Sequence, residues 1–293
     1  MQKERLGRTG LLVPKLGLGA GHIGDPQQPD ASVAQLLNVA RERGVTLVDA
    51  APSYGVAELR LGQLLKPYRS DFILSTKCGY GVPGIQDWTG AAIERGAELA
   101  CRRLQTDHID ILFLHSCPLG TLEYGEVTEA LLRTKARGLA RAVGYSGEGD
   151  ALAYAVASGS FDVIQCSVNV CDQRNLEASI PEARRRGMGV LAKRALANAF
   201  WRHSERPVGQ YAETYWVRAH AMALHPYDMP WPTLALRFAA YAEGVHTALV
   251  GTSNPDHLRA HINAVEAGGL PPDVCAEVRA RFQAHGKDWP GEV

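Results

Sequence analysis

Hydrophobic positions along this chain follow two alternating patterns. Short runs rich in leucine and β-branched residues are separated by longer segments in which apolar residues return every three or four positions. The short runs are typical of buried strands, and the longer segments are typical of amphipathic helices. One such helix is predicted to bury Ile93, Ala97, Ala100 and Leu104.

The ends of several predicted helices are marked by a charged segment, a glycine and then an apolar run. Glycine just past a helix adopts the left-handed cap conformation readily, and basic residues before it complement the helix dipole. Four glycines fit this description: Gly44, Gly138, Gly187 and Gly244. At the start of the helix that precedes Gly44, we expect Asp30 or Ser32 as the N-cap.

The apolar runs predict about eight strands that alternate with helices. They cover residues 15–21, 45–49, 72–77, 109–115, 139–144, 162–168, 188–193 and 245–251. Because these runs are continuously apolar, they favour a parallel sheet covered by helices. Eight such units in roughly 250 residues predict an α/β fold, a (β/α)8 TIM barrel, with a doubly wound open sheet as the alternative. Residues 1–293 are expected to form a single domain of this kind.

One segment breaks the regular spacing. Nearly forty residues separate the seventh run, which ends near Arg194, from the next predicted helix at about Thr233, and they are rich in Trp, Tyr, His and Pro. Because long insertions on a compact barrel usually carry function, residues 196–229 are predicted to form a long functional loop or lid after strand seven.

A further helix is predicted after the eighth strand, towards the C-terminus. Asn254 is its expected N-cap, and Pro255 occupies the first helical position. Its apolar face is formed by Leu258, Ile262 and Val265. A helix N-terminus in this place is suited to hold a phosphate.

Composition narrows the classes of function. With 31 basic and 31 acidic residues the net charge is zero, which disfavours nucleic acid and anionic membranes as partners. The apolar runs are too short to cross a bilayer, and the charged N-terminus lacks an export signal. The six cysteines show neither CxxC pairs nor zinc spacing, which fits reduced thiols. We therefore expect a soluble, cytoplasmic protein.

Polar residues recur where the predicted strands end. Asp49 ends strand two, Tyr54 lies in the following loop, Lys77 ends strand three, and His115 ends strand four. The later strands contribute Ser146, Gln165, Lys193, Arg194 and the stretch from Gly251 to Ser253. Each residue alone has a structural explanation as a cap, a turn former or a core side chain. In a barrel, however, all of them face the C-terminal rim, where barrel enzymes carry out their chemistry.

One proton-transfer device can be formed by four of these side chains together, those of Asp49, Tyr54, Lys77 and His115. A unit charge roughly 4 Å away, at an effective dielectric of about 20, is worth about 4 kcal/mol or on the order of three pKa units. We therefore expect Lys77 to lower the pKa of Tyr54, which would make this phenol a usable acid near neutral pH. Asp49 would keep Lys77 charged, and His115 would hydrogen-bond the substrate oxygen.

In order and spacing, these motifs resemble the aldo-keto reductases, which are NAD(P)H-dependent barrels that reduce aldehydes and ketones. The resemblance extends over essentially the whole chain, from LGRTGLLVPKLGLG through VDAAPSYG, STKCGY, IDILFLH, RAVGYSG and DVIQCSVN to VGTSNPDHL. It implies that Asp49, Tyr54, Lys77 and His115 form the catalytic tetrad. Hydride would pass from nicotinamide C4 to a carbonyl carbon while Tyr54 protonates the oxygen, with no metal. It also implies a monomer or a small homo-oligomer.

The resemblance assigns the nicotinamide contacts less uniformly. Ser146 and Gln165 correspond to residues that hold the carboxamide, but Gly147 stands where the family has Asn. At strand seven the family's aromatic-Ser-Pro-Leu is replaced by a cationic pair, Lys193 and Arg194, followed by Ala and Leu196. We expect the Lys193 stem to pack on the nicotinamide and Arg194 to reach the pyrophosphate, with a surface basic pair as the alternative. A lysine charge at this place disfavours the oxidative direction.

Adenosine contacts are implied after strand eight. Gly251, Thr252, Ser253 and His257 are expected to contact the cofactor. Of these, Ser253 and His257 correspond to family positions around the adenosine 2′-phosphate, so NADPH is favoured over NADH. His257 and His261 are also spaced as a metal pair, although the sequence offers no third ligand.

The substrate is left open. Ala20 and Gly21 stand where the family often has Thr-Trp, so a wall of the pocket is missing. Other candidate wall residues are His22, Trp88, Trp201, Tyr211, Tyr215 and Trp216. Three alternatives to a reductase remain: a cofactor-binding sensor with little turnover, an aldose-type dehydrogenase that runs in the oxidative direction, and a phosphate-binding barrel isomerase or lyase. The complete tetrad favours catalysis.

Overall fold

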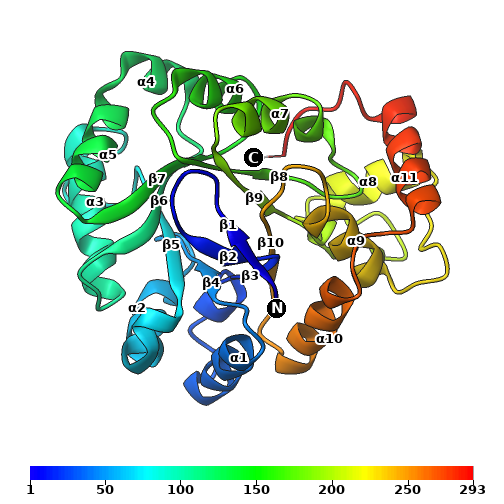
Figure 1. Ribbon diagram of the computed structural model, residues 1–293, viewed down its shortest axis with the longest axis horizontal. Coiled ribbons are helices and arrows are strands. Elements are labelled where there is room, and N and C mark those ends of the chain that lie inside the picture. Colours follow the sequence, from blue (N-terminus) through cyan, green and yellow to red (C-terminus); the bar gives the residue numbers. More distant parts are fainter. Residues whose placement is uncertain (293) are drawn as a thin grey trace.

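The computed structural model describes residues 1–292, which form a closed barrel of eight parallel strands surrounded by helices (Figure 1). The strands follow one another in chain order, and the last pairs with the first. They are β3 (Leu16–Gly19), β4 (Leu47–Asp49), β5 (Ile73–Cys78), β6 (Ile109–His115), β7 (Ala140–Ser146), β8 (Val163–Ser167), β9 (Gly189–Lys193) and β10 (Thr247–Gly251). Each strand overlaps one of the predicted apolar runs. The predicted (β/α)8 barrel is therefore confirmed, and the open sheet is excluded.

An antiparallel hairpin, which the sequence pattern did not predict, precedes the barrel. It consists of β1 (Lys3–Arg5) and β2 (Leu12–Pro14). Its apolar residues Leu6, Leu11 and Val13 pack against side chains of the barrel interior. The hairpin therefore closes the N-terminal end of the barrel, and the C-terminal rim is left for polar residues.

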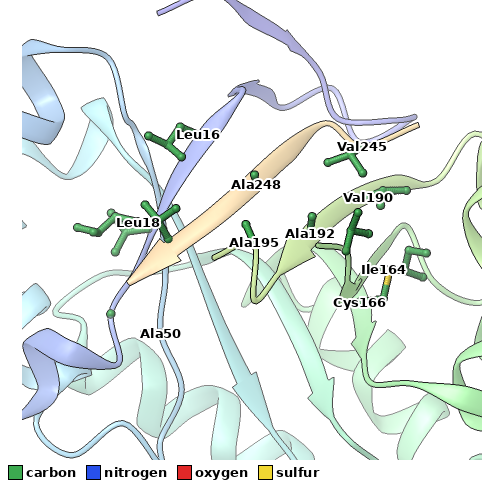
Figure 2. Packing of buried hydrophobic residues seen from close by; sticks show 14 of the residues in the cluster. Leu16, Leu18, Ala50, Ile164, Cys166, Val190, Ala192, Ala195, Val245 and Ala248 are labelled. Atoms are coloured by element: carbon green, nitrogen blue, oxygen red, sulfur yellow. The ribbon is translucent and has the colours of Figure 1, made fainter. Parts of the chain in front are cut away.

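Side chains of the barrel strands alternate between the interior and the helix layer, as the strand period of two requires. Outward residues of β3, β8, β9 and β10 pack in the large cluster beneath the helices, where Figure 2 shows Leu16, Leu18, Ile164, Cys166, Val190, Ala192 and Ala248. Inward residues such as Leu47, Ile111 and Phe113 form a separate cluster. The Phe113 ring fills the space beside Gly144, where an added Cβ would lie 2.4 Å from it. The barrel interior next to the hairpin is thus a packed core.

Eleven α-helices are present in residues 1–292, and most of them lie outside the barrel. They are α1 (Asp30–Glu42), α2 (Ala57–Leu65), α3 (Gly90–Arg103), α4 (Leu119–Tyr124), α5 (Glu126–Ala136), α6 (Gly149–Ser158), α7 (Ser179–Arg185), α8 (Glu213–Ala221), α9 (Trp231–Ala240), α10 (Pro255–Glu266) and α11 (Pro272–His285). Short 3-10 segments add η1 (His22–Gly24), η2 (Lys66–Asp71), η3 (Arg174–Leu176) and η4 (Ala197–Arg202). The predicted buried faces of α3 and α10 are confirmed. Within residues 1–292, no helix is long and apolar enough to span a membrane.

The predicted helix caps are only partly confirmed. Gly44, Gly138 and Gly187 follow the C-caps of α1, α5 and α7 with φ values of 77°, 76° and 68°. Gly244 also has a positive φ of 88°, but it lies in the loop beyond the end of α9 rather than at its cap.

The predicted N-cap of α1 is wrong. Pro29 occupies the cap position without a side-chain hydrogen bond, and Asp30 is the first helical residue. The Asp30 carboxylate instead accepts a hydrogen bond from Arg60 Nε at 2.6 Å. A contact with a residue of α2 has therefore replaced the local capping interaction.

The segment after β9 is more ordered than a loop. It contains η4 and α8, and α9 begins at Trp231, before the predicted start at Thr233. Its aromatic side chains pack on one another: the Trp201 and Trp231 rings stack with centroids 5.8 Å apart. Tyr215 is fully buried, and Trp216 stacks on His220. These aromatic residues therefore serve the packing of the insertion itself.

Candidate active site

The polar residues predicted to act together lie on inward-facing strand positions at the C-terminal end of the barrel. Asp49 follows inward Leu47 by two positions, and Lys77 has the same parity as inward Ile73. Strand pairing places Asp49 opposite Ser75 in the neighbouring strand. By the same rule, Ser146 lies between His115 on one side and Gln165 on the other. Every second residue of a strand points into the barrel. These inward residues are aliphatic towards the N-terminal end of the barrel and polar at the C-terminal rim, where they come together.

Asp49 and Lys77 form a buried ion pair. Lys77 Nζ lies 2.7 Å from Asp49 Oδ2 and donates to the Ala50 carbonyl at 2.8 Å, while Ser75 Oγ donates to Asp49 Oδ1 at 2.6 Å. The side chains of Lys77 and Asp49 are only 1% and 5% exposed. Burial acts to lower the pKa of Lys77, but Asp49 and Tyr54 outweigh it, so this pKa is raised above the ordinary value. Lys77 is therefore a permanent cation beneath the rim.

Tyr54 lies over this cation. Lys77 Nζ is 4.9 Å from the centroid of the Tyr54 ring, and the ring of His115 meets Tyr54 edge-on with centroids 6.4 Å apart. Burial raises the pKa of Tyr54 above its ordinary value, and the opposing effect of Lys77 does not compensate. The predicted lowering of this pKa is therefore wrong for the protein without cofactor. The phenol stays protonated at neutral pH, as a proton donor requires.

Two glycines that the sequence analysis did not single out place the loop of Tyr54. A Cβ on Gly24 of η1 would lie 1.8 Å from the Tyr54 carbonyl oxygen. Gly55 has a φ of 54°, and a Cβ there would lie 2.3 Å from the Gly24 carbonyl oxygen. Val56 N closes this contact by donating to Gly24 at 2.9 Å. The two backbones meet without side chains between them, which fixes the height of Tyr54 above Lys77.

His115 ends β6 beside Tyr54. Burial lowers the pKa of His115 to about 3, with further lowering from Lys77, Lys193 and Arg194, so the imidazole is neutral. Its Nδ1 is hydrogen-bonded to the hydroxyl of Tyr80. Tyr80 was not predicted as a site residue, although its place three residues after Lys77 in the STKCGY motif was visible.

Ser146 and Gln165 form the pair predicted to hold a carboxamide. Ser146 Oγ donates to Gln165 Oε1 at 2.8 Å, and both residues are only 1% exposed. Gln165 Nε2 is buried and has no hydrogen-bond partner among residues 1–292. A buried amide donor without a partner is costly, so this group fits the carboxamide oxygen of a bound nicotinamide.

The absence of Asn at position 147 has a steric cause. A Cβ on Gly147 would lie 2.5 Å from the Tyr145 hydroxyl and 2.6 Å from its ring. That hydroxyl donates to the Cys117 carbonyl at 3.0 Å, which holds the ring in place. Tyr145 therefore occupies the space that a side chain at position 147 would need.

The charge of Lys193 is balanced by a carboxylate of the protein itself. Its Nζ lies 3.4 Å from Glu148 Oε1, and the Glu148 carboxylate also accepts from Ser167 N at 2.7 Å and Asn175 Nδ2 at 2.8 Å. Burial lowers the pKa of Lys193, and Glu148 opposes this effect. The sequence pattern identified Lys193 but not Glu148 as its counterion.

Arg194 is already hydrogen-bonded in this arrangement. Its Nε donates to the Tyr211 hydroxyl at 2.9 Å, and its Nη1 donates to Ser167 Oγ at 3.4 Å and to the Glu292 carbonyl. The segment after α11 thus returns over the barrel, as Figure 1 shows, and Pro290 O accepts from Arg218 Nη2 at 2.6 Å. A pyrophosphate would have to share or displace these contacts of Arg194.

The predicted adenosine contacts lie around the start of α10. Asn254 caps this helix as predicted, because its Oδ1 accepts from Asp256 N at 2.8 Å and from His257 N at 3.4 Å. Ser253 is partly exposed, and the side chain of His257 is exposed at the first turn. Within residues 1–292, no three His, Cys, Asp or Glu side chains are grouped to hold a metal.

The remaining predicted contacts of the rim differ in accessibility. Thr252 is buried, and its hydroxyl accepts from Asn254 N at 3.1 Å. Leu196 packs against the main apolar cluster, and Gly251 lies against exposed His22, whose Cδ2 would be 2.7 Å from an added Cβ. A Cβ on Gly21, in contrast, would have no neighbour within 4 Å. The space next to Gly21 is therefore free of other protein atoms.

Comparison with known proteins identifies the family. A model of the Aldo/keto reductase family matches residues 15–281. L-galactose dehydrogenase of Arabidopsis thaliana is 29% identical and aligns over 100% of this chain and 98% of its own length. The NADH-specific methylglyoxal reductase of Escherichia coli (strain K12) is 25% identical, with 90% and 94% covered. The holo form of an aldo-keto reductase from Bacillus halodurans superimposes with a TM-score of 0.82 at 26% identity and covers 96% of each chain. The chain therefore belongs to the aldo/keto reductase family of oxidoreductases.

Proposed function

We propose that this protein catalyses NAD(P)H-dependent interconversion of a small aldehyde or ketone and its alcohol, with Tyr54 as the group that exchanges the proton. When bound, the nicotinamide would supply or accept the hydride. The observation that carries the proposal is the geometry around Lys77, which is buried, paired with Asp49 and placed 4.9 Å from the Tyr54 ring beside His115. Four side chains from three strands and one loop thus meet at the rim where barrel enzymes work.

Each residue has a separate task in this proposal. Tyr54 remains protonated because its pKa is raised, so it donates a proton to the carbonyl oxygen in the direction of reduction. Lys77 stabilises the phenolate that is left, and Asp49 holds the ammonium in place. Neutral His115 donates one hydrogen bond to the substrate oxygen and orients the carbonyl.

Cofactor contacts are proposed on the same rim. Ser146 and Gln165 would hold the carboxamide, because the free Nε2 of Gln165 needs an acceptor. We keep NADPH as the favoured cofactor on the strength of Ser253 and His257 at the N-terminus of α10. One relative is named as NADH-specific, so the dissociation constants of both cofactors have to be compared.

Both carbonyl reduction and alcohol oxidation are candidate directions of the reaction. The ion pair of Lys193 with Glu148 bears on the oxidative direction. A free lysine charge would repel the cationic oxidised nicotinamide, but the Glu148 carboxylate lies 3.4 Å from this ammonium and offsets its charge. The objection to a dehydrogenase is thereby weakened. A relative named L-galactose dehydrogenase supports an aldose-type substrate as the second candidate.

One experiment separates the possible functions. The protein is mixed with NADPH and a panel of aldehydes, and with NADP and a panel of aldoses, while nicotinamide absorbance is followed. Tyr54→Phe is expected to reduce turnover by about 10²–10⁴-fold, because it removes the exchangeable proton. Tyr124→Phe, at a tyrosine that is 81% exposed, is the matched control and should leave turnover unchanged.

The outcomes are distinct. Turnover that depends on Tyr54 supports the proposal in whichever direction it is found. Tight cofactor binding without turnover on either panel would favour the sensor, and turnover that survives Tyr54→Phe would remove Tyr54 from its role.

A further inference from the structure

Tyr80 lies where it can control the histidine of the site. It follows β5 (Ile73–Cys78), and its hydroxyl lies between two partners, Nδ1 of His115 and Oγ of Ser53 at 3.0 Å. The rings of Tyr80 and His115 are tilted by 31° with centroids 5.5 Å apart. One ring nitrogen of His115 is therefore engaged by Tyr80, and Nε2 is the nitrogen left for a substrate.

We propose that Tyr80 is a positioning residue that donates its hydroxyl proton to His115 Nδ1 and so fixes the Nε2–H tautomer. The inference rests on the proposed function, in which His115 donates to the substrate oxygen. The second ring nitrogen of a histidine sets which tautomer is present, because a neutral imidazole has one N–H donor and one acceptor. A tautomer with the proton on Nδ1 would present only a lone pair to a carbonyl oxygen, which cannot be bound in that way.

The donor and acceptor capacities support this direction. His115 is neutral and has one acceptor nitrogen, and Tyr80 has one proton to give to either His115 or Ser53. A phenol is a stronger donor than a serine hydroxyl, and an imidazole nitrogen is a stronger acceptor than a hydroxyl oxygen. Tyr80 therefore donates to His115, and exposed Ser53 is left to donate to the Tyr80 oxygen.

The ring of Tyr80 is held in position by Trp88. The Trp88 ring meets Tyr80 with centroids 6.1 Å apart, and Trp88 N donates to the Gly79 carbonyl at 2.7 Å. The Trp88 ring also covers Gly79, where an added Cβ would lie 2.2 Å from it. Gly79 can have no side chain for this reason, and the same close contact holds Trp88 against Tyr80. The hydroxyl is thus pre-organised for His115.

The test observes the tautomer directly in the protein without cofactor. Imidazole ¹⁵N shifts of His115 are assigned with a His115→Asn variant and compared among wild type, Tyr80→Phe and Ser53→Ala. We expect the Nε2–H tautomer with a hydrogen-bonded Nδ1 in wild type and in Ser53→Ala. Tyr80→Phe should mix the two tautomers and shift the Nδ1 signal. Tyr241→Phe, which removes a hydroxyl bonded to the Val265 carbonyl at 2.8 Å, is the control and should change nothing.

Activity adds a second readout. Tyr80→Phe should lower kcat by about 5–50-fold with a smaller change in cofactor Kd, because only the hydrogen bond to the substrate oxygen is misplaced. An Nδ1–H tautomer in wild type, or an unchanged spectrum in Tyr80→Phe, would overturn the inference. The spectrum is recorded without cofactor or substrate, so a failure of the proposed function would appear separately, as turnover insensitive to Tyr54→Phe.

Discussion

Separating Lys77 from Asp49 is the perturbation that most directly tests the polar core of the site. The two side chains are 1% and 5% exposed and meet at 2.7 Å, so neither charge can be hydrated if its partner is removed. Removing one member of a buried pair costs roughly 3–5 kcal/mol, whereas replacing both by neutral groups is often nearly neutral. We therefore expect Lys77→Met and Asp49→Asn each to lose about 3–5 kcal/mol of unfolding free energy.

The double variant should recover most of this loss. Ser75 Oγ can still donate to the amide oxygen of Asn at position 49, and Met fills much of the volume of the lysine stem. If the double variant loses about 1 kcal/mol and each single variant about 3–5 kcal/mol, the coupling free energy is about 5–9 kcal/mol. It is measured by urea unfolding of wild type, the two single variants and the double variant. Because the pKa of Lys77 is raised in the folded state, its contribution is fully present below the ordinary lysine value of about 10.4 and is lost above it, so pH 7 measures the whole effect.

The same proteins separate stability from chemistry. The double variant should be folded and nearly as stable as wild type, yet its turnover should fall, because no cation stabilises the Tyr54 phenolate. Single variants that lose less than about 1 kcal/mol, or losses that simply add in the double variant, would refute the reasoning about burial.

Three further perturbations test other parts of the structure. Burial raises the pKa of Asp172 to about 6 from 3.8, so the folded state holds its proton longer and this group reduces stability as pH rises from about 4 to 6. Asp172→Asn should remove about 2 kcal/mol of this pH dependence between pH 4.5 and pH 7, measured as the difference from wild type in unfolding free energy at the two pH values, and parallel profiles would contradict it. Gly79→Ala places a Cβ 2.2 Å from the Trp88 ring at a φ of 132°, so we expect a loss of about 1–3 kcal/mol in chemical denaturation and altered tryptophan fluorescence; an unchanged emission spectrum would argue against it. Gly24→Ala places a Cβ 1.8 Å from the Tyr54 carbonyl oxygen and should lower kcat/KM by about 10²-fold through displacement of Tyr54. Gly120→Ala, at a glycine with open surroundings, is the control for activity.

Some contacts of the site could not have been read from the chain because they join residues far apart in sequence. Glu148, which follows β7, forms an ion pair with Lys193 at the end of β9. Tyr80, which follows β5, is hydrogen-bonded to His115 at the end of β6. The sign of the Tyr54 pKa shift is a further example. The charge of Lys77 was correctly expected to lower it, but the larger effect of burial depends on everything that packs around the phenol.

Local pattern alone determined the barrel and the placement of its polar residues. Eight apolar runs, the capping glycines such as Gly44, and the cap at Asn254 depend on interactions within a few residues, which the sequence displays directly. Asp49 and Lys77 could be placed at the rim because parallel strands end on the same side. Only the tertiary structure decided that Pro29 occupies the N-cap position of α1, that the insertion forms α8, and that the segment after α11 reaches Arg194. These outcomes depend on sums of burial and long-range contacts, which exist only once the chain has closed into a barrel.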